Sequence, residues 1–136
     1  MVVNNFSELA AAITGNNNYN TIYLNADIEM TARIDYPVSK TNLTINGTYT
    51  NEQGVTARHT LTDMNSSSIT DSIYIASAAS EINVTLCNLD IIGKNYYGLV
   101  AVAAASSTKV VTLTYENVNY TGPQISYNRQ GMVRYI

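Results

Sequence analysis

A repeat of 29 residues in the second half of the chain constrains the fold more than any other feature of the sequence. The segment V-T-L-C-N-L-D-I-I-G (84–93) aligns with L-T-Y-E-N-V-N-Y-T-G (113–122). The paired positions include Thr85 with Thr114, Asn88 with Asn117, Leu89 with Val118 and Gly93 with Gly122. Partial copies, N-L-T-I-N-G (42–47) and T-I-Y-L-N (21–25), occur earlier. Strand-type units that recur every 20 to 30 residues or so predict a solenoid, in which each unit buries its apolar face by stacking on the next.

The opening residues predict one amphipathic helix over residues 5–14. Its apolar residues recur at helical spacing: Phe6, Leu9 and Ile13. Ser7 or Asn5 can cap its N-terminus, and the run T-G-N-N-N (14–18) ends it, with Gly15 at its C-terminal end. A helix that precedes the first strand is expected to cover the end of the solenoid, where open backbone groups would otherwise promote aggregation.

From residue 20 onward, apolar residues alternate with polar ones, which predicts short strands. The alternating sets are Ile22 and Leu24; Ile28 and Met30; Leu43 and Ile45; Ile82, Val84 and Leu86; Leu89 and Ile91; Val111, Leu113 and Tyr115; Val118 and Tyr120. Segments 59–64, 72–77 and 99–103 are further predicted strands. Strands this short, joined by bends such as Asn46-Gly47, favour a parallel β-helix over a sandwich. The sequence therefore predicts an all-β chain with one domain (1–136), in which residues 20–136 form about four to five β-helix coils.

Low charge limits the partners of this chain. Charged residues form 12% of it, about half of the usual share, and the net charge is −3 with seven basic residues. No basic stripe can follow a phosphate backbone, so nucleic acid is excluded as a partner. No apolar stretch reaches the length of about 18 residues that membrane insertion requires. The N-terminus does not resemble a signal peptide. Because the composition favours Asn, Thr, Ser and Tyr, we expect an extracellular or cell-surface protein whose signal was removed; a cytosolic protein is the alternative.

Residues that could support nucleophilic or metal chemistry are scarce. A single cysteine, Cys87, excludes an internal disulfide and a cysteine-based metal site. Cys87 aligns with Glu116 in the repeat, so we expect a partly exposed, inert thiol at a bend or on the solvent side. The lone histidine, His59, has no acidic neighbour at ligand spacing, and we expect an ordinary strand or turn position for it. The sequence predicts no metal and no cofactor.

The charged residues do not form a catalytic pattern. The aspartates Asp27, Asp35, Asp63, Asp71 and Asp90 are dispersed, as are Arg33, Arg58, Arg129 and Arg134. A glycosidase needs two carboxylates about 5–9.5 Å apart across a cleft. Asp90 aligns with Asn119 in the repeat, so stacking brings no second carboxylate to it. We therefore predict no catalytic residues. Without an activated group, an enzymatic function could be inferred only by analogy with other proteins of the same fold.

Two asparagines fall at equivalent bends of the repeat. Stacked side-chain amides of Asn88 and Asn117 can bond to each other and to the backbone. They would satisfy polar groups that otherwise cost about 1–3 kcal/mol each when buried. The sequence thus predicts a structural asparagine ladder at this bend.

Tyrosine dominates the aromatic residues, with 11 Tyr against one Phe and no Trp. Tyr96, Tyr97 and Tyr127 are candidates for a surface that contacts a glycan or a protein, because tyrosine offers a flat apolar face with a polar tip. By contrast, Tyr115 and Tyr120 align with the apolar positions Leu86 and Ile91, so we expect them to face inward or to lie at the edge.

The sequence also resembles a known family. The segments F-S-E-L-A-A-A-I (6–13), T-I-Y-L-N-A-D-I-E-M (21–30) and N-L-T-I-N-G (42–47) resemble the start of right-handed β-helix proteins of the pectin-lyase-like type. The segment Y-E-N-V-N-Y-T-G-P-Q (115–124) is similar to the pectate lyase-like adhesive domains of Gram-positive surface proteins. The resemblance implies a right-handed β-helix and a non-catalytic adhesive or structural role outside the cell.

Departures from the family leave other hypotheses open. Such domains usually continue with more coils, so the chain is either a fragment of a longer solenoid or a short form whose open end is covered by another copy. In the second case Met132, Val133, Tyr135 and Ile136 form an assembly strand, and head-to-tail stacking builds a filament. A carbohydrate-active lyase or hydrolase is the third hypothesis. The Trp-Ile-Asp-His motif of β-helix polysaccharide lyases is missing, which argues against it.

Overall fold

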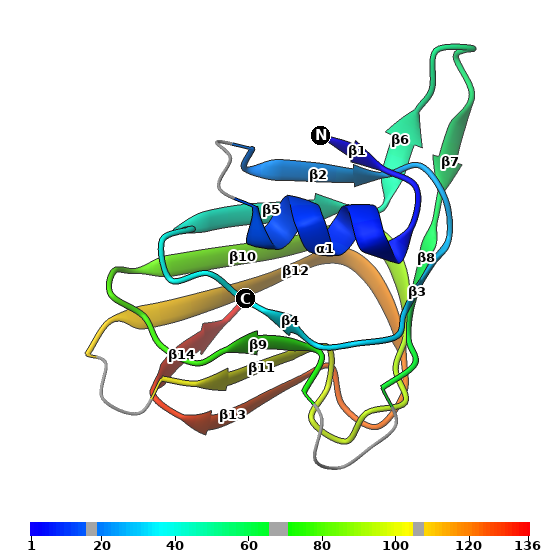
Figure 1. Ribbon diagram of the computed structural model, residues 1–136. Coiled ribbons are helices and arrows are strands. Elements are labelled where there is room, and N and C mark those ends of the chain that lie inside the picture. The colour runs from blue at the N-terminus through cyan, green and yellow to red at the C-terminus, as the bar shows by residue number, and fades with distance from the viewer. Residues whose placement is uncertain (16–18, 66–70, 105–107) are drawn as a thin grey trace.

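The protein is described by a computed structural model that covers residues 1–15, 19–65, 71–104 and 108–136. In these residues two parallel sheets curl around the core, and one short helix lies beside them (Figure 1). The larger sheet contains β1 (Val2–Val3), β2 (Thr21–Leu24), β3 (Ile28–Met30), β5 (Asn42–Asn46), β8 (Thr60–Asp63), β10 (Ile82–Ile92), β12 (Val110–Thr121) and β14 (Met132–Tyr135). The smaller sheet contains β4 (Ile34–Asp35), β9 (Ile73–Ile75), β11 (Val100–Ala103) and β13 (Ser126–Gln130). An antiparallel hairpin contains β6 (Thr48–Thr50) and β7 (Thr56–Arg58).

The 29-residue sequence repeat is the register of the two longest strands. β10 and β12 pair in parallel, with Val84 opposite Leu113 and Ile91 opposite Tyr120. The earlier partial copy pairs with β10 as well, with Leu43 opposite Val84. Equivalent residues of successive copies therefore lie one strand spacing, about 4.8 Å, apart. The predicted repeat is confirmed.

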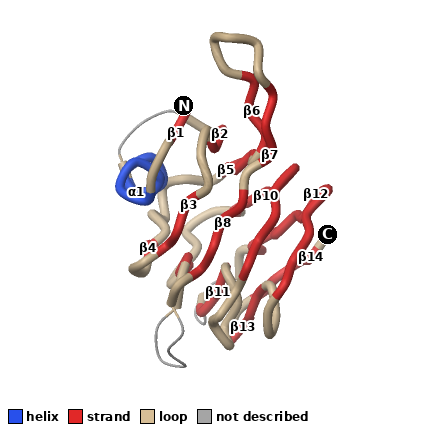
Figure 2. Tube along the Cα trace, turned by 90° about the vertical axis from the view of Figure 1, so that its right-hand side faces the viewer, coloured by secondary structure: helices blue, strands red, loops and turns tan. Residues whose placement is uncertain are grey.

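The long strand β10 corresponds to two short strands in the layer next to it. β5 pairs with the first half of β10 and β8 with its second half. In the next layer β2 pairs with β5, and β3 pairs with β8. The tube in Figure 2 shows these layers side by side. The hairpin β6–β7 is inserted between β5 and β8, and it projects away from the sheets (Figures 1 and 2).

The helix α1 (Phe6–Thr14) begins at Asn5, whose Oδ1 accepts the backbone N–H of Glu8 at 2.9 Å. Of the two predicted caps, the structure thus has Asn5. Leu9 and Ile13 are fully buried, because this face of α1 packs on the core beside β1, β3 and β4. The N–H of Gly15 bonds to the carbonyl of Ala11 at the helix end. The remainder of the predicted stop signal, residues 16–18, lies outside the described residues.

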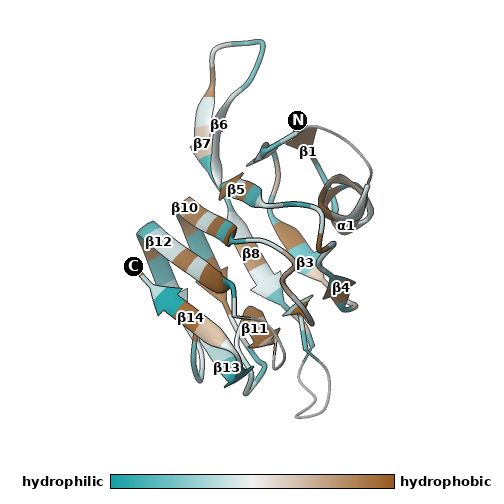
Figure 3. Ribbon diagram, turned by 90° about the vertical axis from the view of Figure 1, so that its left-hand side faces the viewer, coloured by the Kyte–Doolittle hydropathy of each residue, from teal (hydrophilic) through white to brown (hydrophobic). Residues whose placement is uncertain are grey.

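The core is formed by the alternating apolar positions. Most of those predicted are at most 2% exposed: Ile22, Leu24, Ile28, Met30, Leu43, Ile45, Ile82, Val84, Leu86, Leu89, Ile91, Val111 and Leu113. Figure 3 shows the alternation of hydrophobic and polar residues along β10 and β12. At the equivalent positions of β12, Tyr115, Val118 and Tyr120 pack against the core but stay partly exposed. The next strand, β14, pairs only with residues 110–113 of β12, so this end of the core is less covered.

The prediction that Cys87 is partly exposed is wrong, because Cys87 is buried and only 8% of its surface is exposed to solvent. Its predicted alignment with Glu116 is correct, and Asn46 lies opposite it on the other side. A small side chain between two neighbouring strands is shielded by both of them. Burial, followed by the negative charge of Glu116, raises the pKa of the Cys87 thiol above its ordinary value. The thiol is therefore less reactive than a free cysteine.

Candidate functional site

The outer face of the smaller sheet carries tyrosines. Tyr74 in β9 and Tyr127 in β13 both lie opposite Ala101 in β11. The neighbours of Ala101, Val100 and Val102, are fully buried. Because side chains alternate along a strand, Tyr74 and Tyr127 point away from the core. They lie two strand spacings apart, about 9.5 Å, with a small alanine between them.

Three tyrosines form a compact group that we call the tyrosine cluster, namely Tyr96, Tyr97 and Tyr127. The ring centroids of Tyr97 and Tyr127 are 5.0 Å apart, and those of Tyr96 and Tyr97 are 5.3 Å apart. The rings of Tyr96 and Tyr127 are 6.0 Å apart. Tyr96 is 57% exposed, so the cluster offers an aromatic face to solvent. The three residues predicted as a contact surface are brought together here.

The loop that presents Tyr96 and Tyr97 is held by buried polar contacts. The side chain of Asn95 is fully buried, and its Nδ2 donates to Ser72 Oγ at 3.3 Å. Its Oδ1 accepts the N–H of Tyr97 at 2.9 Å. Gly98 closes the turn with a φ of 73°, and its N–H bonds to the carbonyl of Asn95 at 3.1 Å. These contacts hold the loop in one conformation, and a surface that is ordered in advance loses less entropy when it binds a ligand.

Arg129 joins the tyrosine cluster to a buried carboxylate. Its guanidinium carbon lies 4.3 Å from the ring centroid of Tyr97, within range of a cation–π interaction. Its Nη1 and Nη2 donate to Asp71 at 3.1 and 2.8 Å. Asp71 is 2% exposed, so Arg129 supplies the opposite charge that its carboxylate needs.

A second arginine stacks on the same face of the smaller sheet. The guanidinium carbon of Arg33 lies 5.0 Å from the ring centroid of Tyr74. Arg33 Nε also pairs with Asp35 Oδ1 at 2.9 Å, and both side chains are largely exposed. The face therefore combines aromatic rings with guanidinium groups whose charge is balanced locally. Such a face can stack on the C–H face of a sugar ring or on an apolar peptide, and it can donate hydrogen bonds to hydroxyl or carbonyl groups.

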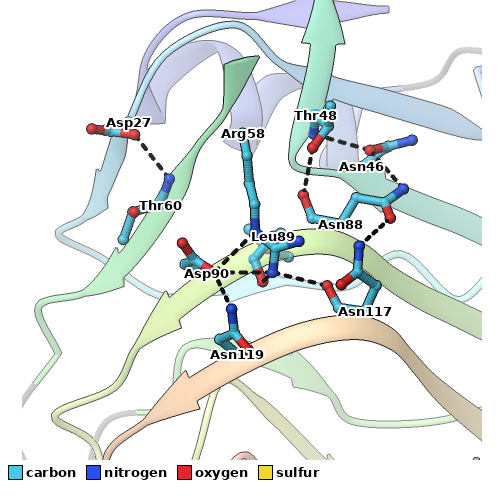
Figure 4. A network of polar contacts seen from close by, with 10 residues as sticks. All are labelled: Asp27, Asn46, Thr48, Arg58, Thr60, Asn88, Leu89, Asp90, Asn117 and Asn119. Atoms are coloured by element: carbon cyan, nitrogen blue, oxygen red, sulfur yellow. Dashed lines mark hydrogen bonds and ion pairs between the residues drawn. The ribbon is translucent and has the colours of Figure 1, made fainter. Parts of the chain in front are cut away.

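The predicted asparagine pair lies at the bend between the two halves of β10 and β12 (Figure 4). Asn88 and Asn117 have φ values of 51° and 53°, a left-handed conformation that asparagine adopts more readily than most residues. Asn117 Nδ2 donates to Asn88 Oδ1 at 2.9 Å, and Asn88 Nδ2 donates to Asn46 Oδ1 at 3.4 Å. Asn46 is thus a third member that the repeat alignment did not identify. These contacts link three successive layers.

Arg58 holds the base of the hairpin against this bend (Figure 4). Its Nε donates to Asp90 at 3.0 Å, and its Nη2 donates to the carbonyls of Leu89 and Asn117 at 2.9 and 3.0 Å. Asp90 also accepts a hydrogen bond from Asn119 at 2.9 Å, the residue that the repeat places beside it. These donors, Asn119 first and then Arg58, lower the pKa of Asp90. These contacts hold the hairpin on the bend. Both charged groups, Arg58 and Asp90, are paired with each other.

Asp27 and Asp63 also have polar partners within the protein. Asp27 Oδ1 lies 3.4 Å from His59 Nδ1, a proximity that the sequence did not indicate. Asp63 is fully buried and accepts hydrogen bonds from Ser72 Oγ at 2.5 Å and from the N–H of Asn65 at 3.0 Å. Burial raises the pKa of Asp63 despite these bonds. Among the residues that the structure describes, no group of three or more His, Cys, Asp and Glu residues could hold a metal ion.

The candidate assembly strand lies at the edge of the larger sheet. β14 pairs in parallel with β12, and Val133 lies opposite Val111. The exposed fractions are 51% for Met132, 50% for Tyr135 and 60% for Ile136. In the order of the larger sheet, β14 is the last strand and β1 the first. The remaining arginine of the sequence analysis, Arg134, lies in this strand.

Sequence reasoning missed several residues of the outer face. The alternation Ile73-Tyr74-Ile75 places Tyr74 outward and was a usable signal. No local signal connects Arg129 with Asp71, because they are 58 residues apart in the chain. Asn95 and Gly98 were likewise not identified, although both shape the loop of the tyrosine cluster.

Comparison with known proteins identifies a family. Comparison with curated proteins and with solved structures gives no significant match. None of the described helical residues form a segment that could cross a membrane. The profile of the pectate lyase-like adhesive domain matches residues 1–127, nearly the whole chain. The chain therefore belongs to the pectate lyase-like adhesive domain family.

Proposed function

We propose that this chain is a non-catalytic adhesive domain of a bacterial surface protein, located outside the cell, and that it binds its target through the tyrosine cluster. The observation that carries the proposal is the fixed arrangement of three tyrosine rings beside Arg129 on an exposed face. Exposed aromatic residues and arginine are enriched where proteins bind other surfaces. The family to which the chain belongs is described as adhesive, which agrees with this role.

The architecture behind the proposal is a right-handed parallel β-helix that forms one domain over residues 1–136. Parallel pairing at a 29-residue offset supports stacked coils. The coils would comprise β2–β3–β4, β5–β8–β9, β10–β11 and β12–β13, with α1 as the cap and β14 beginning a fifth coil. Such a stack presents a long, rigid side surface, which suits a domain that holds a ligand without changing shape.

The tyrosine cluster fits a surface glycan or an exposed protein segment. Its charges are paired, through Arg129 with Asp71 and Arg33 with Asp35. Binding would then depend on ring stacking and hydrogen bonds more than on net charge. A hydrolase or lyase would also need an activated acid, base or metal; on this face Asp71 and Asp35 are each paired with an arginine, and the described residues include no group of three or more His, Cys, Asp and Glu that could hold a metal ion.

Binding to glycan arrays and to immobilised cell-surface proteins tests this proposal. We expect Tyr96→Ala and Tyr127→Ala to reduce binding by about tenfold or more, because stacked aromatic residues dominate such contacts. Tyr19→Ala is the matched control, since Tyr19 is 51% exposed and lies outside the cluster. Loss of binding to the same extent in all three variants would contradict the proposal, as would full binding by a folded Tyr96→Ala variant.

We propose self-assembly as the second candidate function. The two edges of the larger sheet, β1 and β14, are both short parallel strands, and exposed apolar residues lie at each edge. These residues are Met1 and Val2 at one edge and Met132, Tyr135 and Ile136 at the other. Parallel pairing of β14 with β1 of another copy would continue the sheet and build a filament. Light scattering over a concentration series, with electron microscopy, tests it: fibres support assembly, and a stable monomer at high concentration excludes it.

A further inference from the structure

A groove of about 680 Å³ lies on the larger sheet, where the tyrosine cluster contributes no residue. It runs between the start of α1 and the outer face of β3, β8 and the end of β10, and six of its residues matter here: Phe6, Asp27, Glu29, Thr60, Thr62 and Ile92. Small-molecule sites have volumes of about 300–1,000 Å³, so the groove can accommodate a ligand of a few rings.

The floor of the groove is a row of outward side chains. Glu29 in β3 lies opposite Thr62 in β8, which lies opposite Ile92 in β10. The three side chains stand in line at intervals of about 4.8 Å. Ile92 is 42% exposed, and Phe6 from α1 adds a half-buried aromatic ring. The row thus changes from a carboxylate through a hydroxyl to an apolar surface.

Two carboxylates stand together on this floor. Asp27 and Glu29 flank Ile28, which is 2% exposed, so both acidic side chains point outward. Two residues of extended chain separate them by about 7 Å. Asp27 Oδ1 accepts the N–H of Thr60 at 2.9 Å and is therefore held in place (Figure 4). Glu29 takes part in none of the ion pairs of the described residues.

The groove disfavours anionic ligands. Among the residues that the structure describes, no lysine or arginine lines it. At the N-terminus of α1, Asn5 Oδ1 accepts the N–H of Glu8 at 2.9 Å, and the Glu8 carboxylate, which accepts the N–H of Asn4 at 3.0 Å, already places a negative charge near the positive end of the helix dipole. Two acidic side chains then set the local charge: Asp27, which has His59 Nδ1 at 3.4 Å, and Glu29, which takes part in none of the ion pairs of the described residues. Uronic acids and phosphates would be repelled.

We propose that this groove binds an amino sugar with a protonated amine. The ammonium group would lie between Asp27 and Glu29, where carboxylates accept its hydrogen bonds. The sugar hydroxyls would contact Thr60 and Thr62, and the apolar ring face would pack on Ile92 and Phe6. A lysine side chain of a peptide would satisfy the carboxylates but leave the threonine row and Ile92 without partners. A metal ion lacks a third acidic ligand here.

The same geometry gives the groove no hydrolytic chemistry. A glycosidase places its two carboxyl groups on opposite sides of the scissile bond. Asp27 lies directly before β3 and Glu29 lies within it, two positions further along the same extended segment, so both carboxylates are on the same wall of the groove. The groove therefore binds the sugar without cleaving it.

Calorimetric titration with three oligosaccharides of equal length tests the proposal. The ligands are glucosamine, N-acetylglucosamine and galacturonate oligomers, at about pH 6, below the pKa of ordinary amines. We expect the glucosamine oligomer to bind most tightly and the galacturonate oligomer not to bind. Added salt should weaken binding, because the contact is between exposed charges. Equal binding of the acetylated oligomer, or tighter binding of calcium chloride alone, overturns the proposal.

Variants locate the binding in the groove. Glu29→Gln should weaken glucosamine binding by about tenfold, the effect expected when one charged hydrogen bond is lost. Glu52→Gln at the tip of the hairpin is the matched control and should bind like the unaltered chain. Unchanged affinity of a folded Glu29→Gln variant overturns the proposal. Tyr96→Ala should leave glucosamine binding intact, so failure here is distinguishable from failure of the tyrosine cluster as the adhesive site.

Discussion

Arg129 donates two hydrogen bonds to Asp71, at 3.1 and 2.8 Å, across 58 residues of sequence. Asp71 is 2% exposed, whereas a third of the Arg129 side chain is open to solvent. The same guanidinium lies over the ring of Tyr97 at 4.3 Å. One residue thus compensates a buried charge and positions a ring of the candidate binding surface. The ion pair to a buried carboxylate and the candidate binding surface therefore share one residue.

Removal of the Arg129 charge should destabilise the fold. Arg129→Met keeps the length of the side chain but leaves the Asp71 carboxylate buried without its ion pair. We expect a loss of about 2 kcal/mol in the free energy of unfolding, less than for a fully buried pair because Arg129 is partly exposed. Urea denaturation measures it. Arg134→Met, on the exposed strand β14, should change the free energy by less than about 0.5 kcal/mol. Equal losses in the two variants would show that the ion pair does not stabilise the fold.

Two substitutions of Asn88 in the asparagine ladder separate the contribution of backbone conformation to stability from the contribution of hydrogen bonds. Asn88→Ala loses the contacts to Asn46 and Asn117 and places alanine at a φ of 51°. We expect a cost of about 2–3 kcal/mol, the sum of a left-handed residue and one or two hydrogen bonds. Asn88→Gly tolerates this φ, so it should cost about 1 kcal/mol less. Thermal unfolding compares the two, and identical losses would show that backbone strain plays no part.

The repeat explains how far the sequence predicts this structure. An offset read from the letters alone places Cys87 opposite Glu116 and Asp90 beside Asn119, because a parallel register carries a repeat directly into space. Burial of Cys87 was missed, since it depends on strands at both sides rather than on the alternation within one strand. The repeat also shows only two of the three asparagines, as Asn46 belongs to a layer interrupted by the hairpin.

Other features could not be found in the sequence for physical reasons. The hairpin segment 48–58 has little apolar alternation, because it projects from the body and packs little of its surface on the core. Contacts such as Arg129 with Asp71 join segments far apart in the chain, and a single sequence contains no pattern for them. The tyrosines were identified by their chemistry, but their mutual contacts depend on the turn at Gly98.

Two glycines with similar backbone conformations test the loop of the tyrosine cluster. Gly98 and Gly54 have φ values of 73° and 77°. A Cβ at Gly98 would lie 2.5 Å from the backbone of Ile125, whereas a Cβ at Gly54 would meet nothing within 4 Å. We expect Gly54→Ala to cost about 1 kcal/mol, from conformation alone. Gly98→Ala should cost about 3 kcal/mol or more and weaken ligand binding, because the clash displaces the loop. Chemical denaturation and binding assays measure both effects, and equal costs would contradict the role of the close packing.

Asp63 and Asp90 should make the free energy of unfolding change with pH in opposite directions. Burial raises the pKa of Asp63, so the folded state binds its proton more tightly than the unfolded chain does. This destabilises the fold above the folded pKa, and stability is regained as pH falls through that pKa. Hydrogen bonds from Asn119 and Arg58 lower the pKa of Asp90, so its stabilising contribution is lost as pH falls through its folded pKa. Between pH of about 7 and 3, the unaltered chain should therefore gain stability relative to Asp63→Asn and lose it relative to Asp90→Asn. Urea titrations at a series of pH values measure the two differences, and slopes of the same sign would contradict the assignment of burial to Asp63 and pairing to Asp90.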